Sequence, residues 1–144
     1  MPIDDIEFRN AIFNFSITVT SKCNLKCSYC HFYEYGKHKN HEEISQKLFE
    51  KYVQFLEWLK IKNYNISYRF SGGEPLTIGE RIFDLAQYST ERLKIAPYVM
   101  TNGLLLNEYV VAKSKNRISA YVVSMENPFD VDKGSIKSEI NIKK

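Results

Sequence analysis

The stretch FNFSITVTSKCNLKCSYC, residues 13–30, joins a strand pattern to a loop that is rich in cysteine. Across residues 13–20, apolar side chains alternate with hydroxyl or amide side chains, and the apolar ones are aromatic or β-branched. This two-residue period predicts a β-strand with one apolar and one polar face. The loop that follows carries three thiols: Cys23, Cys27 and Cys30. The sequence therefore predicts a thiol-bearing loop directly after a strand.

These thiols are the only three cysteines among 144 residues. An odd number within so short a loop favours a metal site over a disulfide framework. A cubane iron–sulfur cluster normally takes four thiolates, so three thiolates leave one iron able to bind a ligand. The competing interpretation is a zinc ion held by the three thiols and one imidazole, from His38 or His41.

Beyond the cysteine loop, helix and strand patterns alternate. Apolar residues at three- and four-residue steps predict helices over residues 43–60, 78–93 and 105–115. Period-two patterns predict further strands over residues 66–71, 97–101 and 118–125. Because strands and helices alternate, the sequence predicts βαβ units and an α/β fold with a parallel sheet.

The first two predicted strands each have one polar face. Its side chains are hydroxyl, amide or cationic: Asn14, Ser16, Thr18, Thr20, Ser67, Arg69 and Ser71. Strands of a parallel sheet that is covered on both faces are normally continuous apolar runs. The polar face therefore indicates a cavity that holds water, a cofactor or a substrate. The alternative is that it meets solvent because a barrel is incomplete.

A marked segment follows each of the four predicted strands. The segments are the cysteine loop, SGGEPL at residues 71–76, TNG at residues 101–103 and SMEN at residues 124–127. Ligands of parallel α/β sheets and barrels bind at the carboxyl ends of the strands. The shared location predicts one binding site at this edge of the sheet.

The spacing CxxxCxxC, with Tyr29 before the last thiol, resembles the defining motif of the radical S-adenosylmethionine (radical SAM) superfamily. The GGEP segment, residues 72–75, resembles a second motif of that family, and the resemblance spans residues 13–127. It is greatest to the members that modify peptides or proteins, the SPASM type. The resemblance implies that residues 1–127 form about half of a partial TIM barrel, followed by a polar tail over residues 128–144.

The resemblance also implies a role for each motif. The three cysteines would ligate a [4Fe–4S] cluster, whose remaining iron would be chelated by the amino and carboxylate groups of S-adenosylmethionine. Further residues would contact this cofactor: Tyr29, Gly72, Gly73, Glu74, Pro75, Thr101 and Ser124. Among them, the GGE segment would receive the methionine amino group, with the Glu74 carboxylate as an acceptor. The implied chemistry is reductive cleavage of S-adenosylmethionine to a 5′-deoxyadenosyl radical.

Partners follow from the same resemblance. It implies an external electron donor of the flavodoxin or ferredoxin type and a peptide or protein substrate. The core of this family normally has six βα units, so we expect a fragment or a short form that a partner chain completes. The alternative is a catalytically incompetent remnant or a module that carries a cluster. An uncovered fourth strand predicts association when the chain is alone.

Charge and hydropathy exclude other classes of function. The net charge is +3, and the 20 basic residues are scattered along the chain, so the sequence does not predict a nucleic-acid site. No apolar run approaches the roughly 20 residues that span a bilayer, and the first residues are acidic rather than basic and apolar. We therefore expect a cytoplasmic protein that does not bind a membrane.

Overall fold

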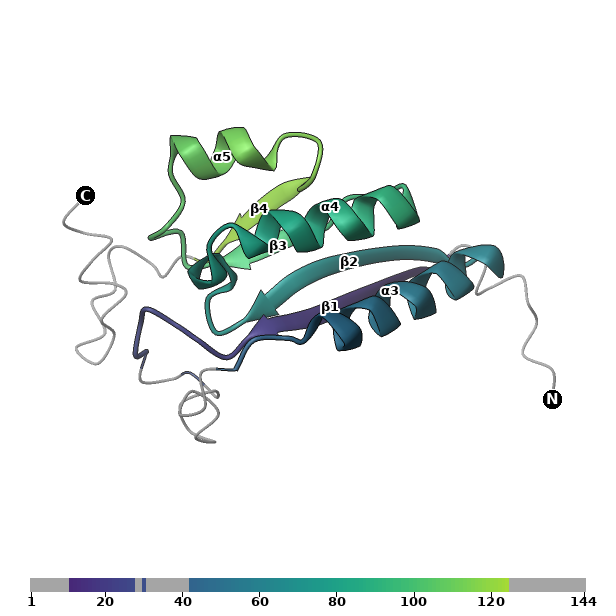
Figure 1. Ribbon diagram of the computed structural model, residues 1–144, viewed down its shortest axis with the longest axis horizontal. Coiled ribbons are helices and arrows are strands. Elements are labelled where there is room, and N and C mark those ends of the chain that lie inside the picture. The colour runs from purple at the N-terminus through teal and green to yellow at the C-terminus, as the bar shows by residue number, and fades with distance from the viewer. Residues whose placement is uncertain (1–10, 28–29, 31–41, 125–144) are drawn as a thin grey trace.

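The computed structural model describes residues 11–27, 30 and 42–124, which form one parallel sheet with helices between its strands (Figure 1). The strands lie in the order β1-β2-β3-β4. Their bounds are β1 Ile12–Thr20, β2 Asn65–Gly72, β3 Tyr98–Thr101 and β4 Ala120–Val123. The connecting helices are α3 Gln46–Ile61, α4 Arg81–Leu93 and α5 Glu108–Ser114, with a short 3₁₀ helix, η2, at Pro75–Ile78. The predicted alternation of strands and helices and the predicted parallel sheet are confirmed.

Helix α3 begins three residues later than the sequence predicted. Glu43 forms an antiparallel bridge with Thr20, and the Ile44 N–H donates to the carbonyl of Val19 at 2.8 Å. These residues therefore pair alongside the end of β1 instead of starting the helix. The helix starts after Ser45, whose hydroxyl accepts the N–H of Leu48 at 3.2 Å and so caps the first turn.

The next predicted helix, residues 78–93, was wrong at its start. The chain forms η2 first, turns at Gly79 with φ of +61°, and begins α4 at Arg81. Helix α5 is also shorter than predicted, because Asn107 caps it by accepting the N–H of Val110 at 3.0 Å. Both differences arise because capping and turn residues decide where a helix begins, whatever the apolar period around them.

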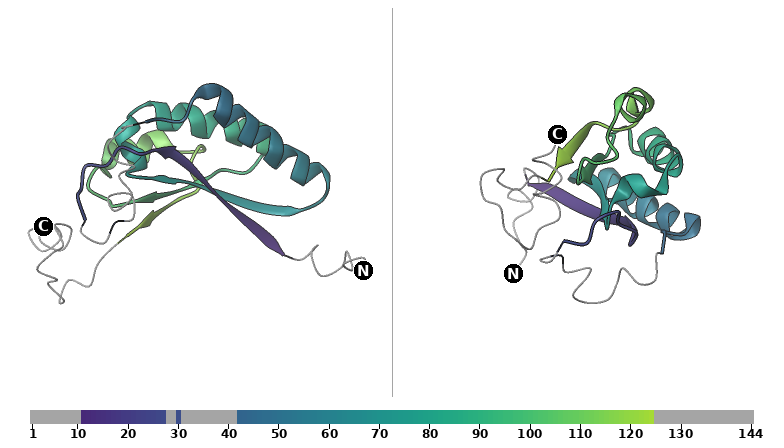
Figure 2. Two further views of the ribbon diagram at one scale, coloured as in Figure 1. Left: turned by 90° about the horizontal axis from the view of Figure 1, so that it is seen from below. Right: turned by 90° about the vertical axis from the view of Figure 1, so that its left-hand side faces the viewer.

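The helices cover one face of the sheet (Figure 2). Side chains of α3, α4 and the strands pack there into a buried core, which includes Phe49, Val53, Leu56, Ile17, Val19, Tyr68, Phe70, Val99, Ile82, Leu85 and Leu93. The rings of Phe49 and Phe70 meet edge to face, with their centroids 5.8 Å apart. Burying one such side chain stabilises a fold by roughly 1.5–3 kcal/mol, so this face holds the sheet and the helices together.

The other face of the sheet is the polar one, and none of the described helices covers it (Figure 2). Along β1, Asn14, Ser16 and Thr18 are exposed as the period-two pattern predicted. Thr20, which the pattern placed on the same face, is only 1% exposed, because it pairs with Glu43 and its hydroxyl donates to the Glu42 carbonyl at 3.1 Å. This face is open in the part of the chain that the structure describes, so the choice between a ligand cavity and a face that meets solvent stays a prediction. Among the described helices, none combines the length and the apolar character that crossing a membrane requires.

Candidate cofactor site

Three loops meet at the carboxyl edge of the sheet. They follow β1, β2 and β3, and we call them the cysteine loop (residues 21–30), the glycine loop (residues 72–75) and the TNG loop (residues 101–103). Strands β1 and β2 run side by side up to this edge, where Thr20 is paired with Gly72. The predicted gathering of motifs at one edge is therefore confirmed for these three loops.

The two glycines allow the glycine loop to touch the start of the cysteine loop. The N–H of Gly73 donates to the carbonyl of Thr20 at 2.9 Å, and the N–H of Glu74 donates to the carbonyl of Lys22 at 2.7 Å. A Cβ on Gly72 would lie 2.1 Å from the Thr20 oxygen, and one on Gly73 would lie 2.2 Å from the Lys22 oxygen. Gly72 also has a φ of +142°, which side-chain-bearing residues rarely adopt. Only glycine fits at either position.

The Glu74 carboxylate is turned into the protein. It is 1% exposed and accepts three hydrogen bonds from protein groups. Its Oε1 accepts from the Leu76 N–H at 3.1 Å and from the Thr101 hydroxyl at 2.7 Å, and its Oε2 accepts from the Asn102 N–H at 2.7 Å. A buried carboxylate needs such donors because its desolvation is otherwise unfavourable. The side chain therefore fastens the glycine loop to the TNG loop, and its predicted contact with a ligand amino group stays a prediction.

The TNG loop is in turn tied to the cysteine loop. Thr101 is 2% exposed, and its hydroxyl accepts the Gly103 N–H at 3.0 Å while it donates to Glu74. The side-chain amide of Asn102 makes two hydrogen bonds. Its Nδ2 donates to Oδ1 of Asn24 at 2.8 Å, and its Oδ1 accepts the Leu104 N–H at 3.0 Å. The sequence predicts an ordinary turn at Asn102 and assigns no role to Asn24. Neither residue is distinguished by a pattern of its own, so only the pairing of the loops reveals their contact.

All three cysteines are free thiols of intermediate exposure on one loop. Cys23 Sγ accepts the Leu25 N–H at 3.4 Å, and the Cys30 N–H donates to the Cys27 carbonyl at 3.1 Å. Burial raises the pKa of the Cys23 thiol; the Leu25 N–H opposes this, and the Glu74 carboxylate adds to it. A thiol with a raised pKa is protonated until a cation binds, so loading a metal would release a proton.

The donor set fits an iron–sulfur cluster in type, since three accessible thiols lie on one short loop. In the part of the chain that the structure describes, no three His, Cys, Asp or Glu side chains lie close enough together to hold one metal ion. The assignment of the cysteines as ligands thus stays a prediction.

The remaining predicted site residues divide into two groups. Pro75 is buried at the start of η2, and Ser124 is exposed beyond β4, where its N–H donates to the Thr101 carbonyl at 2.9 Å. Ser124 thus lies at the same edge as the three loops. Three residues lie outside the described part of the chain: Tyr29, His38 and His41.

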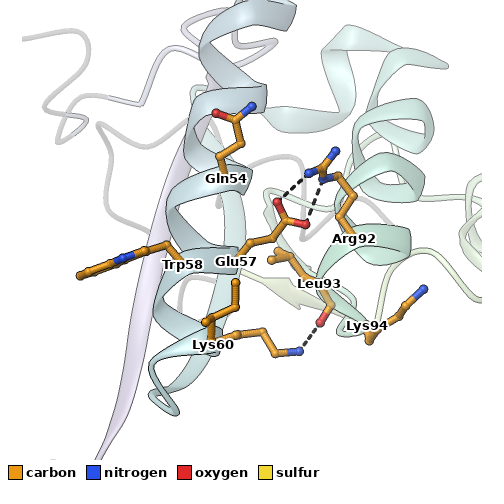
Figure 3. A pocket seen from close by; sticks show the side chains of 8 residues that line it. Gln54, Glu57, Trp58, Lys60, Arg92, Leu93 and Lys94 are labelled. Carbon is orange, nitrogen blue, oxygen red and sulfur yellow. Dashed lines mark hydrogen bonds and ion pairs between the residues drawn. The ribbon is translucent and has the colours of Figure 1, made fainter.

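A cavity of about 460 Å³ lies at the opposite, amino edge of the sheet, between the last turns of α3 and α4 (Figure 3). It is lined by Gln54, Glu57, Trp58, Lys60, Ile61, Arg92, Leu93 and Lys94. None of these lining residues belongs to a predicted motif. This cavity is therefore separate from the edge at which the three loops meet.

A parallel α/β sheet whose carboxyl edge joins a three-cysteine loop to a double-glycine loop defines a class of cofactor-binding partial barrels. Residues 17–143 match the profile of the Radical SAM superfamily, and the chain belongs to that superfamily. The resemblance seen in the motifs is confirmed.

Three similar proteins illustrate the relationship. The radical SAM cyclopropyl synthase TigE of Paramaledivibacter caminithermalis is 30% identical over 88% of this chain and 29% of its own length. The cysteine-type anaerobic sulfatase-maturating enzyme of Clostridium perfringens is 29% identical over 78% of this chain and 32% of its own. The crystal structure of BtrN in complex with AdoMet and 2-DOIA has a TM-score of 0.62 at 27% identity, covering 78% of this chain and 45% of that one.

These relatives confirm the predicted fold class, about half of a partial TIM barrel. The chain spans roughly a third of the length of the curated relatives that it matches. The activity of a whole relative therefore comes to this chain only as a proposal.

Proposed function

We propose that this chain provides the cluster and S-adenosylmethionine site of a radical SAM enzyme. When bound, the cluster and S-adenosylmethionine supply a 5′-deoxyadenosyl radical, which takes a hydrogen atom from a substrate. The observation that carries the proposal is the contact between the glycine loop and the start of the cysteine loop, through Thr20 and Lys22. This contact brings the segment expected to receive an amino group beside the thiols expected to bind iron.

Residues of this chain would divide the work. The thiols of Cys23, Cys27 and Cys30 would hold the cluster. The glycine loop would receive the amino group through backbone carbonyls, since the Glu74 carboxylate already accepts three protein donors. Thr101 and Ser124, which are joined through their backbones, would lie along the remainder of the cofactor, and Tyr29 would lie near its adenine.

The substrate class is a separate proposal. The two relatives point to different substrates. The name of the sulfatase-maturating enzyme indicates a protein substrate, whereas BtrN was crystallised in complex with 2-DOIA. We propose a peptide or protein substrate on the motif resemblance alone. An electron donor of the flavodoxin or ferredoxin type, a chain that completes the barrel and a cytoplasmic location belong to the same proposal.

The test is cleavage of S-adenosylmethionine. The full chain is reconstituted anaerobically with iron and sulfide, reduced with dithionite and incubated with S-adenosylmethionine, and 5′-deoxyadenosine is measured by mass spectrometry. Cys27→Ala removes one predicted cluster ligand. Glu57→Gln, a substitution in the cavity between α3 and α4, serves as the control for a change away from the site. The proposal predicts product from wild type and Glu57→Gln and none from Cys27→Ala. Product at the Cys27→Ala level in every sample would overturn it.

A second candidate is a module that carries the cluster without catalysis. The same samples distinguish the two candidates, because a module would bind iron and sulfide yet release no 5′-deoxyadenosine. A single bound zinc without sulfide would exclude both.

A further inference from the structure

Three side chains form a connected polar group on the open face of the sheet. The Arg69 Nε–H donates to the Ser16 hydroxyl at 3.1 Å, and the Ser16 and Ser71 hydroxyls are 2.7 Å apart. Arg69 and Ser16 are paired across β1 and β2, and Ser71 lies two residues further along β2. The group therefore holds a guanidinium in a fixed place on the face that α3 and α4 leave uncovered (Figure 2).

The guanidinium of Arg69 has donors to spare. A guanidinium carries five N–H groups in a planar fork, and in the described structure the hydrogen bond to Ser16 uses the one on Nε. Among the described residues, no carboxylate pairs with Arg69. Two other arginines differ, since Arg81 pairs with Glu43 at 2.8 Å and Arg92 pairs with Glu57 at 2.8 Å. Arg69 thus presents its terminal nitrogens in a geometry that suits a planar or tetrahedral oxyanion.

The position of this group relates it to the cofactor site. Arg69 lies three residues before Gly72 along β2, which at roughly 3.3 Å per residue is about 10 Å from the glycine loop. Its neighbour on β3 is Tyr98, which is paired with Arg69 and partly exposed, as is Met100 two residues further on. A molecule seated here would place its charged end on Arg69 and its apolar part toward β3 and the carboxyl edge.

We propose that Arg69, oriented by Ser16 and Ser71, binds an anionic group of the substrate, a carboxylate or a phosphate. The inference rests on the proposed function, because it assumes that the substrate lies over this face of the sheet. It narrows the substrate class to molecules that carry an oxyanion. In a peptide this would be a carboxylate side chain or a carboxyl terminus.

The experiment measures anion binding without iron or S-adenosylmethionine. The ¹⁵N-labelled full chain is titrated with N-acetylglycine or with inorganic phosphate, and the arginine Nε–H signals are followed by NMR. The Arg69 signal is assigned by its loss in Arg69→Gln, and the Arg92 signal serves as an internal control because Glu57 already occupies that guanidinium. The proposal predicts a saturable shift of the Arg69 signal and an unchanged Arg92 signal with at least one probe.

Variants separate binding by Arg69 from general screening by salt. Calorimetry with the effective probe should show about tenfold weaker binding in Arg69→Gln and a smaller loss in Ser16→Ala, since that change removes only the orienting hydroxyl. Arg92→Gln should bind like wild type. The relative strength of N-acetylglycine and phosphate identifies the carboxylate or the phosphate. Equal affinity in Arg69→Gln and wild type, or no saturable shift with either probe, would overturn the proposal. Such a failure leaves 5′-deoxyadenosine formation untouched, so it is distinct from a failure of the proposed function.

Discussion

Two glutamates at opposite edges of the sheet have different surroundings. At the carboxyl edge, Glu74 is 1% exposed and accepts three hydrogen bonds, one from η2 and two from the TNG loop. At the amino edge, Glu57 has a side chain that is 26% exposed and pairs with Arg92 at 2.8 Å (Figure 3). An exposed pair is screened by water and stabilises a protein little, whereas a buried carboxylate that loses its donors is strongly unfavourable. At the carboxyl edge, the contacts of a buried carboxylate therefore join the glycine loop to the TNG loop.

The two edges also differ in what marks them as sites. The amino edge has the cavity of about 460 Å³, but the carboxyl edge has the connections among the cysteine, glycine and TNG loops. Those connections fix three separate loops relative to one another, which a cofactor with several contacts requires. Substitutions at the carboxyl edge should therefore lower the free energy of unfolding more than substitutions at the amino edge.

Gly72→Ala should have the largest effect. Its Cβ would lie 2.1 Å from the Thr20 oxygen at a φ of +142°, so the two loops must separate. We expect a loss of about 3 kcal/mol in the free energy of unfolding, measured with urea, together with loss of iron binding. Gly79→Ala is the matched control: its φ is +61° and nothing lies within 4 Å of the added Cβ. It should lose about 1–2 kcal/mol, from backbone strain alone. Equal losses would show that the contact between the loops is unimportant.

Glu74→Gln should come next. The amide has the same shape but presents a donor where one oxygen now accepts, so a buried hydrogen bond to Thr101 or Asn102 is lost. We expect a loss of about 2 kcal/mol in the free energy of unfolding and faster hydrogen exchange at the Asn102 amide. Glu57→Gln, the equivalent change at the amino edge, should lose at most about 0.5 kcal/mol. The comparison between the edges is wrong if the two variants lose stability equally.

Asn24→Ala should have a local effect. It removes the 2.8 Å hydrogen bond from the Asn102 amide, which joins the cysteine loop to the TNG loop. Because the contact is exposed, we expect a loss of only about 0.5–1 kcal/mol in the free energy of unfolding. Hydrogen exchange should nevertheless become faster at Leu25, inside the cysteine loop. Unchanged exchange there would argue against a tie between these loops.

Arg92→Gln should have the smallest effect. The hydrogen bond and charge of the Glu57 carboxylate raise the pKa of Arg92, which is charged at neutral pH in any case. Both side chains remain partly exposed, so the loss of stability should be small. The difference from wild type should vanish in 1 M salt, where the Debye length is about 3 Å. A loss that persists in high salt would indicate a packing role for Arg92.

The sequence predicted the parts of this fold that depend on local pattern. The strand over residues 13–20, the order of strands and helices and the meeting of motifs at one edge all follow from periods and turn residues. The start of α3 could not be predicted in this way, because it depends on the pairing of Glu43 with Thr20, more than twenty residues earlier. The donors to Glu74 could not be predicted either, since Thr101 and Asn102 reach it only once β2 and β3 are paired. Contacts of this kind depend on register, which no local pattern contains.

The central claim is that the carboxyl edge holds an iron–sulfur cluster through three thiols and leaves one iron for S-adenosylmethionine. The most direct measurement is electron paramagnetic resonance of the anaerobically reconstituted, reduced chain before and after S-adenosylmethionine is added, alongside iron and sulfide counts. We predict about four irons and four sulfides per chain and a spectrum that changes when S-adenosylmethionine binds. An unchanged spectrum, or a single zinc without sulfide, would contradict the account.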